Sequence, residues 1–136
     1  MGLGLPGRSV AMEIEVKEIA PGPAASAMNA AGLRAALDCD TAEQIAAGGQ
    51  CFSMQTPQGA CVAVLRVKGS VLWIDGAGAT QPGRGITEAG LELAEQIARR
   101  AGCNQVAFET VRPGLVRKSK QQGFAVAGYI MRKELQ

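Results

Sequence analysis

Two glycines separated by one residue, Gly83 and Gly85, lie between an apolar stretch and a helical pattern. Residues 71–77 are typical of a buried strand, and residues 87–101 carry apolar side chains at helical spacing. A helix N-terminus leaves backbone N–H groups without partners, and glycine lets an anion approach the backbone closely. We therefore predict a phosphate site here, with Arg84 as an added cation, although a chain with 18 glycines also forms such turns by chance.

The chain contains no histidine, which excludes Ser-His-Asp and Cys-His catalysis and every histidine-ligated metal site. Its cysteines show neither the CxxC spacing of a zinc site nor a disulfide framework: Cys39, Cys51, Cys61 and Cys103. The last three lie in or beside apolar stretches without a partner base. We therefore expect buried, inert thiols in a cytoplasmic protein, and no metal.

A chain of 136 residues suits one domain, which we place at residues 12–136 after a flexible lead-in at residues 1–11. Hydrophobic residues make up 47% and charged residues 19%, which is typical of a globular protein. A formal net charge of +2 does not favour nucleic acid as a partner. No apolar run reaches the length of a signal peptide core or a membrane span, so we expect no membrane partner.

Apolar periodicity and turn residues predict the element order β, α, α, β, β, β, α, β, α, β. The predicted strands are residues 13–19, 50–56, 60–68, 71–77, 105–111 and 124–132. The predicted helices are residues 24–37, a short helix capped by Asp40 and closed by Gly48, residues 87–101 and residues 113–122, with a glycine loop at residues 79–86. This order predicts an α+β fold with a single mixed, mostly antiparallel sheet of about six strands and helices on both faces.

Three stretches follow one another in the second half of the chain: the loop Gln81-Pro82-Gly83-Arg84-Gly85-Ile86, the helix at residues 91–102, and the pair Gly123-Phe124. Together they resemble the GNAT superfamily of acyl-CoA-dependent N-acetyltransferases. In that family such a loop binds pyrophosphate, such a helix follows it, and a Gly-Phe pair closes the last helix. The similarity covers residues 70–135, whereas the N-terminal half matches only in its element order.

The resemblance implies acetyl-CoA as the acyl donor. In the family, the strand before the loop separates from the next strand and pairs with the pantetheine arm, a role that falls here to Ala77, Gly78 and Ala79. The helix N-terminus and its loop hold the pyrophosphate. This implies contacts with Gln81, Gly83, Arg84, Gly85, Ile86 and Thr87.

Acyl transfer requires a neutral amine, so a base should take its proton. Without histidine the candidates are carboxylates, and Asp75 and Glu109 are best placed because each lies near the point where the strands separate. Each also has a non-catalytic interpretation. Asp75 is then a residue at the end of a strand whose carboxylate is hydrogen-bonded by nearby backbone groups, and Glu109 is then an ordinary exposed side chain. Ser119 falls where many family members have the tyrosine that protonates the departing thiolate.

The sequence thus predicts a GNAT-type N-acetyltransferase that moves an acetyl group from acetyl-CoA directly to an amine. The alternative is a catalytically inactive module that binds CoA or a protein partner, which the missing tyrosine and histidine favour. A nucleotide-binding module fits less well, because no ribose-binding acidic residue is evident. The sequence does not identify the amine acceptor, and it leaves open whether the chain forms a homodimer. It also leaves open the role of a basic face formed by Arg117, Lys118 and Lys120.

Overall fold

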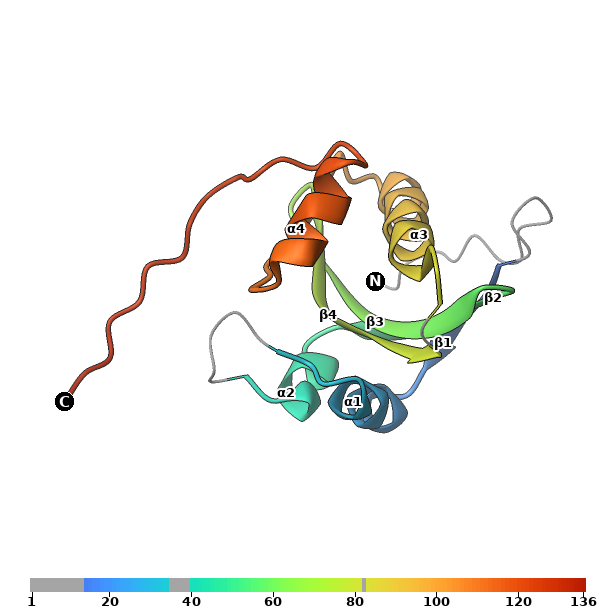
Figure 1. Cartoon of the computed structure of the whole chain (residues 1–136), viewed down its shortest axis with the longest axis horizontal. Coiled ribbons are helices and arrows are strands. Elements are labelled where there is room, and N and C mark those ends of the chain that lie inside the picture. Colours follow the sequence, from blue (N-terminus) through green and yellow to red (C-terminus); the bar gives the residue numbers. More distant parts are fainter. Residues whose placement is uncertain (1–13, 35–39, 82) are drawn as a thin grey trace.

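The computed structural model describes residues 14–34, 40–81 and 83–136. The predicted lead-in at residues 1–11 therefore lies outside the described residues. Among the described residues, five strands form one sheet in the order β1-β2-β3-β4-β5 (Figure 1). The strands are β1 (Glu15–Ile19), β2 (Gln50–Thr56), β3 (Gly59–Lys68), β4 (Val71–Gln81) and β5 (Gln105–Phe108). The helices are α1 (Pro21–Ala30), α2 (Ala42–Ala47), α3 (Ile86–Arg100) and α4 (Pro113–Lys120).

The first four strands form an antiparallel arrangement in which tight turns join β2 to β3 and β3 to β4. The Thr56 hydroxyl stabilises the first of these turns by accepting hydrogen bonds from the N–H groups of Gln58 and Gly59 at 3.1 and 3.2 Å. β5 pairs with β4 in the parallel direction, because α3 crosses over between them. The sheet is mixed and mostly antiparallel, as predicted.

Helices cover both faces of the sheet, which also agrees with the prediction (Figure 1). α1 and α2 lie on one face, where Met28 and Val64 are fully buried in a cluster of mainly small side chains. α3 lies on the other face, and Leu93 and Ile97 belong to the same buried cluster as Leu72 of β4. The sheet thus separates two cores, because successive strand residues point to opposite faces.

The sequence of α3 explains its position and its bounds. Arg99 and Arg100 occupy its last turn, where cations interact favourably with the helix dipole, and Gly102 follows with a φ of 78°. Its buried side chains recur at helical spacing: Ile86, Leu91, Leu93, Ala94, Ile97 and Ala98. None of the helices within the described ranges is long and apolar enough to span a membrane.

The bounds of α1 differ from the prediction. The helix begins at Pro21, because proline fits the first helical turn, and it ends at Ala30, before the predicted end. Gly32 terminates it with a φ of 76°, and the N–H of Leu33 donates back to the carbonyl of Met28 at 3.0 Å.

The cap of α2 also differs from the prediction. Thr41 caps the helix instead of Asp40, because the Thr41 hydroxyl accepts from the N–H of Gln44 at 3.2 Å. The Gln44 side chain in turn accepts from the N–H of Thr41 at 2.9 Å, which completes a reciprocal capping box.

Two strands end elsewhere than predicted, and one predicted strand does not form. β4 continues to Gln81, because its second half stays paired with β3, and β5 already ends at Phe108. The predicted strand at residues 124–132 is wrong. Gly123 and the apolar residues after it predicted this strand, but such a segment forms a strand only where another strand lies within reach. Here it runs away from the sheet beyond the end of α4 (Figure 1). Within the described ranges the sheet therefore has five strands.

Candidate functional site

β4 and β5 separate halfway along β4. Their pairing stops after Ile74 and Phe108, whereas β4 continues to Gln81 with β3 as its partner. From Asp75 onward, the outer edge of β4 thus faces no other strand in the described part of the chain. Backbone N–H and C=O groups on such an edge can pair with an extended ligand, as the resemblance implied.

A β-bulge lies where the strands separate. Val64 pairs with Gly76 and the next residue of β3 pairs with Ile74, which leaves Asp75 as the extra residue. The guanidinium of Arg66 donates to both carboxylate oxygens of Asp75, at 2.8 and 3.1 Å. The hydrogen bond to Asp75 raises the pKa of Arg66. The hydrogen-bond partner of the Asp75 carboxylate is therefore a side chain on the neighbouring strand. The non-catalytic interpretation of Asp75 expected backbone partners instead.

The glycines of the loop before α3 each have a structural cause. Gly85 has a φ of 85°, which disfavours any side chain. A Cβ on Gly83 would overlap the backbone carbonyl of Gln58, at the turn between β2 and β3. Pro82 lies outside the described residues. Both glycines are thus explained by a tight turn, which was the alternative to a phosphate site. The same turn also leads the backbone into the N-terminus of α3.

The N-terminus of α3 has no side-chain cap, because its N-cap residue is Gly85. The N–H of Ile86 donates to the carbonyl of Gly83 at 3.3 Å, but the N–H groups of Thr87 and Glu88 have no such partner in the described structure. An uncapped N-terminus of a long helix favours an anion. The carboxylate of Glu88 lies beside it, because a Cβ on Gly85 would be 3.7 Å from Glu88 Oε2.

A cleft of about 920 Å³ lies between the free edge of β4 and helix α4. The start of α3, the segment that follows α1, helix α2 and the strands β2 and β3 also line it. Seven of the predicted site residues line it: Asp75, Ala77, Gly78, Ala79, Ile86, Thr87 and Glu109. The other predicted cofactor residues form the loop after β4 and are not part of the lining: Gln81, Gly83, Arg84 and Gly85.

The two predicted carboxylates occupy corresponding places on neighbouring strands. Asp75 directly follows Ile74, and Glu109 directly follows Phe108, in the last pair of residues that joins β4 to β5. Glu109 is exposed and makes no hydrogen bond or ion pair with any described residue. Of the two, Glu109 is the carboxylate with both oxygens available to a ligand.

Helix α4 turns Ser119 away from the cleft. Ser119 is buried, its hydroxyl donates to the carbonyl of Val116 at 3.0 Å, and it lines a groove on the other side of the helix. Leu115 and Lys118, three residues apart, face the cleft instead. From the sequence, Lys118 was expected only on a basic face. Helical spacing from Leu115 is the signal that places Lys118, and not Ser119, on the side of the cleft.

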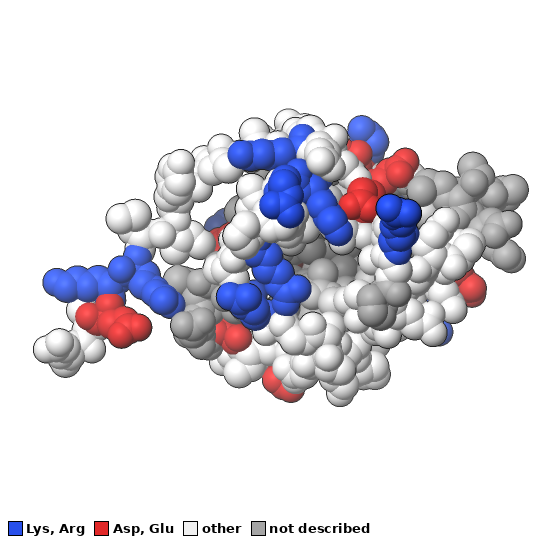
Figure 2. Space-filling model, viewed as in Figure 1, with Lys and Arg blue, Asp and Glu red and all other residues white. Residues whose placement is uncertain are grey.

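Arg112 connects the two sides of the cleft. Its guanidinium donates to the carbonyl of Gly32, beyond the end of α1, at 2.8 Å. Arg34 lines the same cleft, as does Lys118. Figure 2 shows Lys and Arg side chains gathered over α4 and the surface below it, beside a hollow. Cations at this opening attract an anionic ligand.

Two of the described cysteines are poor nucleophiles. Cys51, Cys61 and Cys103 are free thiols. Burial raises the pKa of Cys61 to about 11, and burial with a smaller contribution from Glu18 raises the pKa of Cys51. Both thiols therefore stay protonated near neutral pH, which agrees with the inert role expected from the sequence.

No protein-family model and no curated protein sequence matches the chain. Solved structures match it along almost its whole length. A transcriptional regulator from Bacillus halodurans C-125 has a TM-score of 0.61 and 14% identity, covering 90% of this chain and 99% of that one. An aminoglycoside N-acetyltransferase in complex with CoA has a TM-score of 0.55 and 10% identity, covering 92% and 96%.

A ribosomal-protein-alanine N-acetyltransferase from Brucella melitensis biovar Abortus 2308 has a TM-score of 0.55 and 17% identity, covering 89% of this chain and 99% of that one. At such identities the likeness shows a shared fold. The fold class predicted from the sequence is thereby confirmed.

Proposed function

We propose that this chain, which has the GNAT fold, is an N-acyltransferase that moves an acetyl group from acetyl-CoA directly to an amine. The observation that carries this proposal is the cleft itself. One opening brings together the free edge of β4, the uncapped N-terminus of α3 and an available carboxylate at Glu109. An extended, anionic thioester and an amine need these three features at one place.

Acetyl-CoA supplies an activated acetyl group, an amide-containing arm and a pyrophosphate. The backbone of Ala77 to Ala79 offers hydrogen-bonding groups to the amides of the arm, because no strand of the described residues pairs with this edge of β4. The N–H groups at Thr87 and Glu88, together with the loop from Gly83 to Gly85, suit the pyrophosphate. Arg84 beside them adds a positive charge.

In the transfer, the neutral amine nitrogen forms a bond to the acetyl carbon, and the bond from that carbon to sulfur breaks. We assign the removal of the amine proton to Glu109, since its carboxylate lines the cleft and has no partner among the described residues. Lys118 lines the cleft and can return a proton to the departing thiolate, a role that Ser119 does not have from its buried position. Asp75 positions the bulge through Arg66.

A module that binds CoA or a protein without turnover is the second candidate. The orientation of Ser119 favours it, because the side chain at the family's tyrosine position does not line the cleft. The fold alone does not decide between the two, since a structure described as a transcriptional regulator shares it with the acetyltransferases. We place either activity in the cytoplasm, where the free thiols stay reduced.

Calorimetric titration with acetyl-CoA and with free CoA, followed by a turnover assay, tests the proposal. We expect saturable binding of both and release of free CoA that depends on an added amine, across a panel of peptide N-termini, lysines, polyamines and aminosugars. Tight binding without amine-dependent release would favour the non-catalytic module. Absence of CoA binding would refute both cofactor-dependent readings.

Replacing Glu88 by glutamine should strengthen CoA binding about threefold to tenfold at low salt. The carboxylate lies beside the N-terminus of α3 and repels a phosphate there, and the amide removes this repulsion with little change of shape. Titrations at low and high salt measure the effect, which should shrink as salt increases. Equal affinity of the variant and the original chain at low salt would place the pyrophosphate elsewhere.

A further inference from the structure

The charged side chains that line the cleft divide into a paired and an unpaired group. Arg66 and Asp75 neutralise each other through hydrogen bonds of 2.8 and 3.1 Å. The other charged residues of the lining form no ion pair with any described residue: Arg34, Asp40, Glu109, Arg112 and Lys118. Cations outnumber carboxylates in this unpaired group, so the cleft keeps positive charge for a ligand that carries an acidic group.

Arg112 holds one of these positive charges in a fixed place. The Thr110 hydroxyl accepts from the N–H of Arg112 at 3.0 Å, which shapes the turn between β5 and α4. The guanidinium donates to the carbonyl of Gly32 at 2.8 Å, and a guanidinium has five N–H donors, so others remain for a ligand. This bond also bridges the cleft from α4 to the segment after α1, which favours a small molecule over a protein surface as the occupant.

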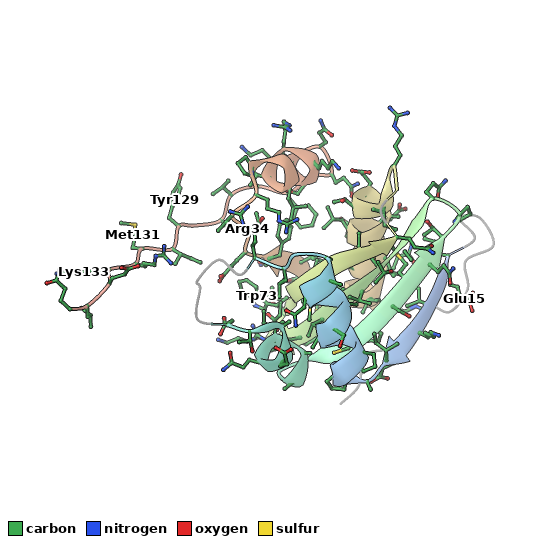
Figure 3. The ribbon with its side chains drawn as sticks, turned by 60° about the horizontal axis from the view of Figure 1, so that its bottom comes forward. Glu15, Arg34, Trp73, Tyr129, Met131 and Lys133 are labelled. Carbon is green, nitrogen blue, oxygen red and sulfur yellow. The ribbon has the colours of Figure 1, made fainter. Side chains whose placement is uncertain are left out.

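Arg34 brings a second positive charge to the same part of the cleft. It follows Gly32 by two residues, so its backbone lies close to the carbonyl that Arg112 binds. Figure 3 shows Arg34 on the segment after α1, on the side that faces α4. Arginines offer planar donor groups that match a carboxylate or a phosphate, and two of them side by side favour an anion between them.

The sheet separates these two arginines from the proposed pyrophosphate site. α1 and the segment after it cover one face of the sheet, whereas α3 covers the other (Figure 1). The N-terminus of α3 and the loop before it already suit the pyrophosphate of the donor. The positive charge at Arg34 and Arg112 is therefore placed for the second substrate, the acceptor.

We propose that the acceptor is a small zwitterion, an amine that also carries a carboxylate or a phosphate. Its acidic group binds Arg34 and Arg112, and its amine lies at Glu109. Glu109 precedes Arg112 by three residues, across the turn that Thr110 shapes, so one short segment holds the negative and the positive end of the site. A zwitterion matches both ends, whereas a polyamine is repelled by the arginines. The inference rests on the proposed function, because it names the amine that receives the acyl group.

Acyl transfer to matched pairs of amines tests this specificity. Glycine, β-alanine, γ-aminobutyrate and ε-aminocaproate are each compared with their own carboxamide, and O-phosphoethanolamine is compared with ethanolamine. We expect kcat/KM of the best acid to exceed that of its partner without the acid about tenfold, because the partner loses a charge-assisted hydrogen bond to arginine. The graded chain lengths measure the span from Glu109 to the arginines, and the phosphate pair shows which acidic group is preferred.

Replacing Arg34 by glutamine removes one positive charge of this site. We expect KM for the best acid to rise about tenfold with kcat unchanged, and the preference for the acid over its carboxamide to fall by the same factor. Arg99→Gln is the matched control, since it removes the same charge from an exposed position outside the cleft lining and should change neither value. An equal loss of affinity for acetyl-CoA in Arg34→Gln would assign this arginine to the donor and overturn the proposal.

Calorimetry distinguishes a failure of this inference from a failure of the proposed function. The same acids and carboxamides are titrated into the chain saturated with free CoA, which permits binding without transfer. Acid binding that depends on Arg34, in a chain without turnover, would support the acceptor site and contradict acyl transfer. Turnover of carboxamides, polyamines or peptide N-termini as efficient as that of the acids would support acyl transfer and overturn the zwitterion, as would the absence of acid binding.

Discussion

Replacing Gly85 by valine should weaken acetyl-CoA binding by about a hundredfold while the chain still folds. Gly85 has a φ of 85°, a conformation that a β-branched residue does not tolerate, so the backbone before α3 must change. Loss of two hydrogen bonds to a charged phosphate costs about 3 kcal/mol, which corresponds to that factor. Calorimetric titration with acetyl-CoA measures the change.

Gly102→Val provides a matched control at the opposite end of the same helix. Gly102 also has a positive φ, 78°, and no atom would lie within 4 Å of its Cβ. Both variants should therefore lose comparable stability, about 1–2 kcal/mol, but only Gly85→Val should lose affinity. If Gly102→Val weakened CoA binding as much, the effect would come from general destabilisation, and the anion site at the start of α3 would be refuted.

Replacing Glu109 by glutamine should lower kcat by about a hundredfold to a thousandfold with CoA affinity unchanged. The amide keeps the shape of the side chain but cannot take a proton from the amine. Initial rates of CoA release at saturating substrates measure kcat, and calorimetric titration with acetyl-CoA measures the affinity.

Two other substitutions define what the Glu109 result means. Glu92→Gln removes the same charge from an exposed position on α3 and should leave kcat unchanged. Asp75→Asn breaks the pair with Arg66 and should cost at most about 1 kcal/mol of stability, because the pair is partly exposed. Full activity in Glu109→Gln together with a large loss in Asp75→Asn would exchange the roles of the two carboxylates.

Much of the fold follows from the sequence because its signals are local. The turn residues Pro57 and Gly59 predicted a hairpin, and β2 has the predicted bounds. The segment at residues 124–132 is also rich in apolar residues and follows a turn glycine, yet it pairs with no strand of the described residues. Side-chain patterns predict that a segment is able to pair, but the presence of a neighbouring strand depends on tertiary structure.

The site was harder to predict for a similar reason. The resemblance predicted that Glu109 and the loop glycines lie in one region. Contacts between residues that are distant in the sequence produce no periodic pattern, so they could not be predicted in this way. The ion pair between Arg66 and Asp75 depends on a one-residue bulge in β4. That Lys118 and not Ser119 lines the cleft depends on how α4 is rotated about its axis. An error of one residue in a helical register moves a side chain by about 100° around the axis.

The contact between the β2–β3 turn and the loop before α3 restricts how this chain can change in length. The turn fits against the loop at two glycines: a Cβ on Gly83 would overlap the Gln58 carbonyl, and a Cβ on Gly59 would come within 2.5 Å of the Gln81 carbonyl. An inserted residue in this turn would displace the loop. The turn at Gly69, where no atom would lie within 4 Å of a Cβ, offers room for a tag, a reporter or a permuted terminus.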